Sequence, residues 1–216
     1  MANDGPRAAA VQRDLIALVA DANMEATLKG LLARPEALGI RSLDFLVVRH
    51  PERDPGVYLR APEFLRPFRH RYAHVLAILD REGSGREELT AADMEQDLGQ
   101  RLAPDWPEGR CAALVIDPEL ETWLWSDSPH VEAVLGWSGR ATSLRSWLVD
   151  EGYLREAENK PHRPKEAVEA ALRVARKPRS SALYERLARR VSLRRCGDVS
   201  FGRLCRILRA WFPEPS

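Results

Sequence analysis

The sequence predicts an α/β fold in which a doubly wound, mainly parallel sheet of four strands is flanked by helices. Three observations point to this fold. Four short apolar runs are continuous rather than alternating, which is typical of strands buried on both faces. Helical patterns lie between these runs. An aspartate directly follows three of the four runs, where ligands of such folds bind.

The predicted strands follow one another along the first half of the chain. They span residues 15–20, 43–48, 73–79 and 112–116. Residues 24–33 and 87–102 place apolar side chains at the spacing of amphipathic helices. Residues 49–71 contain four prolines, so we expect either a functional loop or a short helix near residues 62–68.

The pattern after residue 116 is helical to the end of the chain. Helices are predicted over residues 118–125, 130–137, 142–151, 164–175, 181–191 and 199–211. We therefore divide the chain into an N-terminal tail (1–12), an α/β domain (13–153) and a basic helical C-terminal extension packed on it (154–216).

Length and composition exclude several classes of protein. The chain has 216 residues, of which 44% are hydrophobic, and this is enough for a sizeable core. Its three cysteines are too few for a disulfide framework or a zinc site. Neither a run of about 18 apolar residues nor a secretory signal is visible, so we expect a cytoplasmic bacterial protein without a membrane partner.

The net charge of +1 conceals an uneven distribution. Residues 154–216 carry a balance of +9, and residues 1–153 a balance of −8. Helices that expose arginines to solvent for solubility are one explanation of this pattern. The alternative is a basic face that binds an anion and covers an acidic site.

Carboxylates gather at the ends of the predicted strands. They are Asp21 and Glu25 after the first strand, Asp80 and Glu82 after the third, and Asp117, Glu119 and Glu121 after the fourth. The carboxyl ends of parallel strands share one edge, so these groups should converge. Such a set repels itself unless a proton or a divalent cation relieves it, and Mg²⁺ prefers oxygen ligands.

Helix capping is the competing explanation for two of these acids. Asp117 precedes a proline, a good combination for a helix start, and Asp21 could cap the helix that begins near residue 24. The sequence Asp80-Arg-Glu-Gly-Ser-Gly is harder to explain as a cap, because its two glycines allow the backbone to approach an anion. His50 is expected to bond to its own loop, and the tryptophans to pack in the core.

Three acidic segments resemble those of a known family. Asp21-Ala-Asn-Met-Glu25, Asp80-Arg-Glu82 and Glu119-Leu-Glu-Thr-Trp-Leu-Trp-Ser-Asp127 resemble the acidic motifs of TOPRIM-like domains, the metal-dependent module of topoisomerases, primases and OLD-family nucleases. The resemblance covers about residues 15–127 and is greatest to small stand-alone bacterial TOPRIM-like proteins encoded near defence genes. Segments such as HPERDPG and LDREGSGRE also resemble a component of a methylation-associated phage-defence system.

The resemblance implies a TOPRIM-like sheet and a Mg²⁺- or Mn²⁺-dependent nuclease or phosphotransfer enzyme of antiviral defence. By the resemblance, the metal ligands are Asp21, Asp80 and Glu82, and the catalytic residues are Glu25 and Glu121. DNA or RNA is the implied substrate, with other defence proteins as partners. The phosphate-binding candidates are Lys160, Lys165, Lys177 and Arg179.

Two positions depart from the family pattern. Asp21-Ala22 stands where the family has glutamate and glycine, and Glu82 stands where it has a second aspartate. Because the two exchanges alter the reach of the carboxylates in opposite directions, the alternative is a catalytically degenerate subunit that serves as an interaction component of a defence complex. No oligomeric state is predicted.

Overall fold

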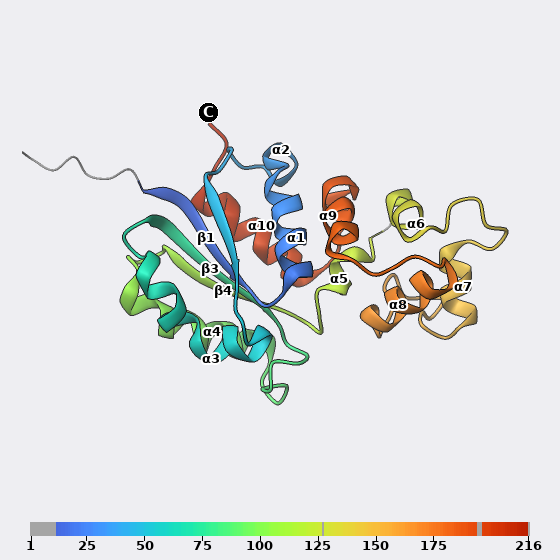
Figure 1. The fold of residues 1–216 in the computed structure, drawn as a ribbon, viewed down its shortest axis with the longest axis horizontal. Helices are drawn as coiled ribbons and strands as arrows, with labels where there is room; N and C mark the ends of the chain where they lie inside the picture. The colour runs from blue at the N-terminus through green and yellow to red at the C-terminus, as the bar shows by residue number, and fades with distance from the viewer. Residues whose placement is uncertain (1–11, 127, 194–195, 216) are drawn as a thin grey trace, which may run out of the picture.

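The fold is that of a computed structural model, which describes residues 12–126, 128–193 and 196–215. A four-stranded sheet lies at its centre (Figure 1). Its strands are β1 (Arg13–Val19), β2 (Phe45–Arg49), β3 (Tyr72–Asp80) and β4 (Cys111–Ile116). All neighbouring pairs are parallel, in the order β2-β1-β3-β4. The predicted α/β class and parallel sheet are confirmed, and the topology is compatible with a doubly wound fold.

Helices cover both faces of this sheet. On one face lie α1 (Ala22–Leu32), α2 (Pro35–Leu38) and α10 (Val199–Trp211), and on the other α3 (Arg53–Leu65) and α4 (Ala91–Leu102) (Figure 1). Helix α9 (Ser181–Arg190) packs against α1. Because helices cover both faces, all four strands contribute buried residues, as the apolar runs predicted.

Helix α3 replaces most of the loop expected over residues 49–71. It is followed by a single 3₁₀ turn, η1 (Arg66–Phe68), so the short helix expected near 62–68 is the end of a longer one. Pro55 lies in the first turn, where a missing N–H removes no intrahelical hydrogen bond. Val57, Ala61 and Leu65 recur at helical spacing and are fully buried, and this burial outweighs Pro62 inside the helix.

The remaining helices lie beside the sheet. They are α5 (Glu121–Leu124), α6 (Pro129–Leu135), α7 (Leu144–Asp150) and α8 (Pro164–Val174), and a second 3₁₀ turn, η2 (Ala103–Asp105), follows α4. Each of the four α-helices lies where a helix was predicted, although α5 is only one turn long. Asp117 does not cap it, because its side chain instead pairs with Arg81 at 2.9 Å. None of the helices in the described part of the chain combines the length and apolar character that a transmembrane span needs.

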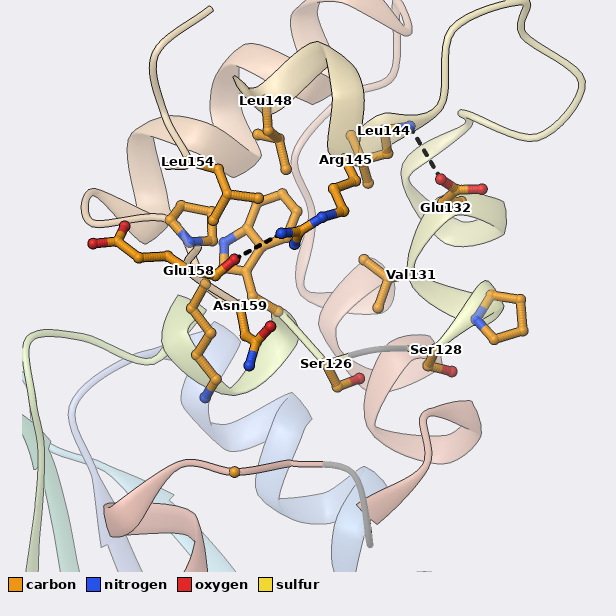
Figure 2. Close-up of a pocket in the computed structure, with 15 residues that line it drawn as sticks. Ser126, Ser128, Val131, Glu132, Leu144, Arg145, Leu148, Leu154, Glu158 and Asn159 are labelled. Carbon is orange, nitrogen blue, oxygen red and sulfur yellow. Dashed lines mark hydrogen bonds between the residues drawn. The ribbon is translucent and has the colours of Figure 1, made fainter. Parts of the chain in front are cut away.

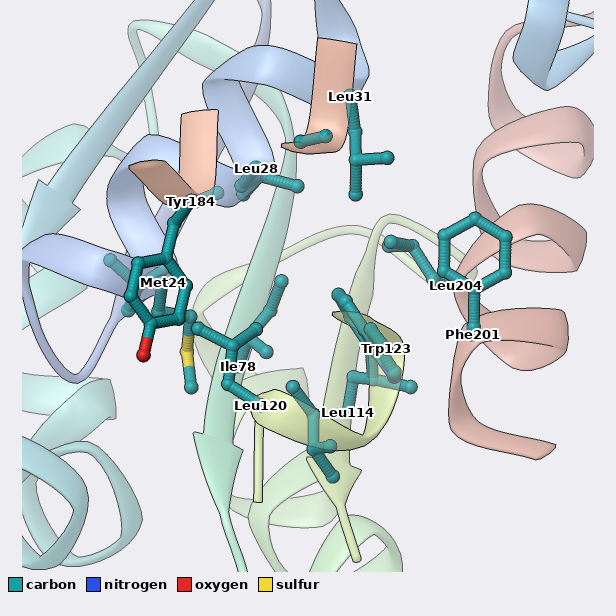
Figure 3. Packing of buried hydrophobic residues seen from close by; sticks show 14 of the residues in the cluster. Met24, Leu28, Leu31, Ile78, Leu114, Leu120, Trp123, Tyr184, Phe201 and Leu204 are labelled. Atoms are coloured by element: carbon teal, nitrogen blue, oxygen red, sulfur yellow. The ribbon is translucent and has the colours of Figure 1, made fainter. Parts of the chain in front are cut away.

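One hydrophobic core joins the sheet to the C-terminal helices. Met24 and Leu28 of α1, Ile78 of β3, Trp123 of α5 and Leu204 of α10 all belong to it (Figure 3). The Trp123 indole packs edge-on against Phe201, and its Nε1 donates a hydrogen bond of 2.8 Å to Ser200 Oγ. Residues 154–216 thus share the core of the α/β part.

Candidate active site at the carboxyl edge of the sheet

The chain changes direction between the two central strands. From β1 it continues into α1 on one face, and from the neighbouring β3 it continues into α4 on the opposite face (Figure 1). In open α/β sheets, ligands bind in the crevice at such a topological switch point. Asp21 follows β1 and Asp80 ends β3, so both predicted acids lie at this place.

Asp80 is the central residue of the site. Its Oδ1 is buried and has no hydrogen-bond partner among the described residues. Burial raises the pKa of the Asp80 carboxyl well above its usual value, and the nearby charges of Asp54 and Glu121 raise it further. Asp80 therefore carries an acceptor oxygen that nothing in the described structure satisfies.

Asp54 is a site residue that the sequence reasoning missed. It lies in the first turn of α3, and its Oδ1 accepts a hydrogen bond of 2.8 Å from the amide of Asp80. Burial raises the pKa of Asp54 to about 6, against the effect of that hydrogen bond, and the charge of Asp21 adds to the rise. The preceding residue, Arg53, has a φ of 52°, which is uncommon for a residue other than glycine.

The signal that could have revealed Asp54 is its place after β2. It belongs to the segment His50-Pro-Glu-Arg-Asp54, which follows a strand just as the other acids do. His50 bonds within this loop as expected, because its Nδ1 accepts a hydrogen bond of 3.1 Å from the amide of Glu52.

Asp21 has the capping role that was one of its two predicted roles. Its Oδ1 accepts hydrogen bonds of 2.9 Å from the amides of Asn23 and Met24 at the start of α1. Its charge also acts on Asp54 and Asp80. Asp21 can therefore cap α1 and still belong to the site.

Two glutamates from the segment after β4 complete the site, and each forms an ion pair with a basic side chain. Glu121 is buried and accepts from Arg179 Nη2 at 2.6 Å and from the Tyr184 hydroxyl at 2.5 Å. Glu119 accepts from the amide of Lys165 at 2.8 Å and lies 3.6 Å from its Nζ. We refer to Asp21, Asp54, Asp80, Glu119 and Glu121 as the acidic cluster.

The four predicted phosphate-binding residues divide into two pairs. Lys165 and Arg179 contact the acidic cluster, as described above. Lys160 Nζ instead lies 3.3 Å from Asp198, and Lys177 Nζ donates to the carbonyl of Val134 at 3.2 Å. The C-terminal third thus supplies two cations to the site.

Glu25 and Glu82 have other surroundings. Glu25 pairs with Lys29 at 2.5 Å and with Arg49 at 2.9 Å. Glu82 is exposed, although it lies near enough to raise the pKa of Glu119, which burial raises most. Their predicted roles as catalytic residue and metal ligand remain predictions.

The chemistry of the acidic cluster suits a hard cation, because all of its donors are carboxylate oxygens. Across residues 12–126, 128–193 and 196–215, however, no three His, Cys, Asp or Glu side chains are arranged to hold a metal ion. Side-chain rearrangement would therefore have to accompany metal binding. The unpaired Oδ1 of Asp80 is the atom that fits a ligand role best.

Comparison with known proteins identifies no relative. The chain matches no protein-family model, no curated protein and no solved structure. The geometry of the acidic cluster is therefore the basis for assigning a function.

Proposed function

We propose that the acidic cluster is the active site of a Mg²⁺- or Mn²⁺-dependent enzyme that hydrolyses or transfers phosphodiesters of nucleic acid. The observation that carries this proposal is the buried Oδ1 of Asp80 at the topological switch point, which has no hydrogen-bond partner in the described part of the chain and lies near Asp54 and Asp21. The resemblance of the acidic motifs to TOPRIM-like domains supports the same reaction class.

The electrostatics favour a divalent cation. Carboxylates this close together raise one another's pKa, and burial adds to the effect, so the metal-free site favours protons. A bound divalent ion would neutralise Asp80 and Asp54 and would supply an activated water and charge stabilisation for a phosphodiester. Asp21, which caps α1 with Oδ1, is the third candidate ligand.

Lys165 and Arg179 are the groups that would bind a phosphate. Each is already held beside the acidic cluster by a glutamate, Lys165 by Glu119 and Arg179 by Glu121. Two oriented cations next to a metal-binding carboxylate set would neutralise the non-bridging oxygens of a phosphodiester. Glu121 would then act by positioning Arg179, with Tyr184 fixing its carboxylate.

The test is metal-dependent cleavage with a matched pair of variants. Single-stranded DNA, double-stranded DNA and RNA are incubated with the purified protein in Mn²⁺ or in EDTA, and Mn²⁺ binding is titrated calorimetrically. Asp80→Asn should abolish binding and cleavage, whereas Asp150→Asn, an exposed aspartate on α7, should retain both. Cleavage that survives Asp80→Asn or EDTA would refute the proposal.

One observation favours a second function, that of a non-catalytic component of a bacterial antiviral defence complex. The cations of the chain itself already neutralise Glu119 and Glu121, as expected of a site that has lost its metal. This reading predicts a folded wild-type protein that does not bind Mn²⁺ in the same titration.

A further inference from the structure

One glutamate binds two basic side chains at the β2 end of the carboxyl edge of the sheet. Arg49 is the last residue of β2, and the strand register places it opposite Val19 of β1. Its Nε lies 2.9 Å from Oε2 of Glu25, and Lys29 Nζ donates to Oε1 of the same carboxylate at 2.5 Å. Two positive charges thus share one negative charge, which leaves an excess of one positive charge. We refer to Arg49, Lys29 and Glu25 as the basic triad.

The basic triad presents its cations to solvent more than its carboxylate. The side chains of Arg49 and Lys29 are 56% and 47% exposed, whereas that of Glu25 is 21% exposed. Arg49 contacts Glu25 through Nε, and its two terminal nitrogens have no partner within residues 12–126, 128–193 and 196–215. Such a guanidinium can donate two parallel N–H groups to a phosphate.

The start of α1 lies between the basic triad and the two cations that contact the acidic cluster. Figure 1 shows α1 between β2 and α9, and both of these neighbours pack against it. On the β2 side, Glu25 of α1 contacts Arg49. On the α9 side, Ser181, which follows Arg179 by two residues, donates a hydrogen bond of 3.2 Å to Asn23 Oδ1 of α1. Basic side chains therefore flank the start of α1 on both sides.

The order of charges along the carboxyl edge follows from the strand order. Arg49 ends β2, Asp21 follows β1, Asp80 ends β3, and Glu121 with its partner Arg179 lies after β4. Neighbouring strands lie about 4.8 Å apart, so the edge from β2 to β4 spans about 14 Å. One strand of B-DNA carries a phosphate about every 3.4 Å along its axis. The two groups of cations are therefore far enough apart to bind different phosphates of one strand, with Asp21 and Asp80 between them.

A cavity of about 950 Å³ beside α5, α6 and α7 offers no comparable excess of positive charge in its described lining (Figure 2). That lining contains two basic residues, Arg145 and Lys160, and two acidic ones, Glu132 and Glu158. Arg145 Nη2 is also engaged, because it donates to the carbonyls of Glu156 and Glu158. The basic triad is therefore the better candidate for binding a phosphate.

We propose that Arg49 and Lys29 bind a phosphate of nucleic acid, and that a single strand crosses the start of α1 from the basic triad to Lys165 and Arg179. This inference rests on the proposed function of the acidic cluster and specifies its substrate. A single strand fits this path because it can bend toward the buried Asp80, whereas a duplex resists bending over such a distance. Because phosphates are bound on both sides of Asp80, the bond that is cleaved lies inside a strand rather than at its end.

Binding in EDTA tests the basic triad without cleavage. Arg49→Ala should weaken the binding of a single-stranded oligonucleotide about fivefold in fluorescence anisotropy, and should lower the slope of log K against log[salt] by about 0.7. Arg66→Ala is the matched control and should bind as wild type. Its side chain is 55% exposed and pairs with Asp105 at 3.1 Å, but it lies beyond the far end of α3.

Glu25→Gln separates phosphate binding from a purely structural ion pair. It should tighten oligonucleotide binding, because it removes the negative charge and leaves both cations in place. If Arg49 served only to pair with Glu25, the loss of either partner would change binding in the same direction. Equal binding by wild type and Arg49→Ala, weaker binding by Glu25→Gln, or no binding by the wild type would overturn the inference.

Circular substrates test the position of the cleaved bond. In Mn²⁺ the wild type should open circular single-stranded DNA or circular RNA, which have no ends, and Arg49→Ala should do so about fivefold more slowly at low substrate concentration. Circles that persist while linear strands are shortened from their ends would overturn this inference and leave the proposed function intact. Conversely, no cleavage of any substrate, together with opposite effects of Arg49→Ala and Glu25→Gln on binding, would refute the proposed function and support the phosphate site.

Discussion

The Oδ1 of Asp54 accepts a hydrogen bond from the main-chain amide of Asp80 at 2.8 Å, which joins the start of α3 to the end of β3. The contact places a second carboxylate near that of Asp80, whose buried Oδ1 has no hydrogen-bond partner among the described residues. It crosses 26 residues of sequence and brings the end of the longest strand against the helix that follows β2. The acidic cluster is built around this contact.

Asp54→Asn should stabilise the metal-free protein at neutral pH. The pKa of Asp54 is raised from 3.8 to about 6 in the folded state, so folding favours the protonated form. The stability of the wild type that depends on this proton is fully present below pH 3.8 and is lost as the pH rises through about 6. The loss amounts to about 3 kcal/mol at most.

The variant keeps the Oδ1 acceptor for the Asp80 amide and does not titrate. Urea unfolding in EDTA should therefore show a small difference in the free energy of unfolding between variant and wild type near pH 4. At pH 7.5 the difference should be larger, with the variant more stable. An equal difference at both pH values would contradict the prediction.

Tyr184→Phe should destabilise the folded protein, because it leaves Glu121 with one hydrogen-bond donor fewer. The Tyr184 hydroxyl is buried, and burial together with the charge of Glu121 raises its pKa, so it stays a donor at neutral pH. We expect a loss of about 1–3 kcal/mol in the free energy of unfolding. Tyr58→Phe removes a similar bond to the half-exposed Asp97 and should cost less. Equal losses would show that burial of the Glu121 contact adds nothing.

Phe212→Ala should destabilise the whole chain rather than its end. Phe212 is fully buried, its amide donates to the carbonyl of Leu208, and its carbonyl accepts from the amide of Arg41 before β2. Removal of such a side chain costs about 3–5 kcal/mol. Urea unfolding should stay a single transition, shifted to lower concentration. Trp211→Ala, at a half-buried neighbour, is the control with the smaller shift. Two separate transitions would show that residues 154–216 fold as an independent unit.

Lys165→Ala should weaken the binding of a single-stranded oligonucleotide more than Lys177→Ala does, although both remove one positive charge. Lys165 lies beside Glu119 in the acidic cluster, whereas Lys177 is hydrogen-bonded to the carbonyl of Val134 in α6. Loss of one phosphate contact should lower the slope of log K against log[salt] by about 0.7–0.9. Fluorescence anisotropy between low and moderate salt measures this slope. A larger effect of Lys177→Ala would contradict the prediction and would indicate that the phosphates bind near Lys177 rather than at the acidic cluster.

Much of the fold could be predicted because its signals are local. The continuous apolar runs marked all four strands to within two residues, since a strand covered on both faces has no polar side to interrupt it. Only the end of helix α3 was expected, as a short helix near residues 62–68, because the four prolines of residues 49–71 are typical of a loop. Helix α4 begins later than predicted because Glu87 turns back to accept hydrogen bonds from the amides of Gly83 and Gly85.

The sequence by itself determined that acids would meet at one edge, because parallel strands carry their following residues to the same side of the sheet. Asp21, Asp80 and Glu121 follow from that rule. Only the tertiary structure decided the rest of the cluster. It added Asp54 through α3, and it bound Glu121 to Arg179, which lies 58 residues further along the chain. It also placed Arg49 of β2 beside Glu25, whose other partner, Lys29, lies one turn further along α1. Contacts such as that of Glu121 with Arg179 depend on the packing of elements far apart in the sequence, and no spacing along the chain records that packing.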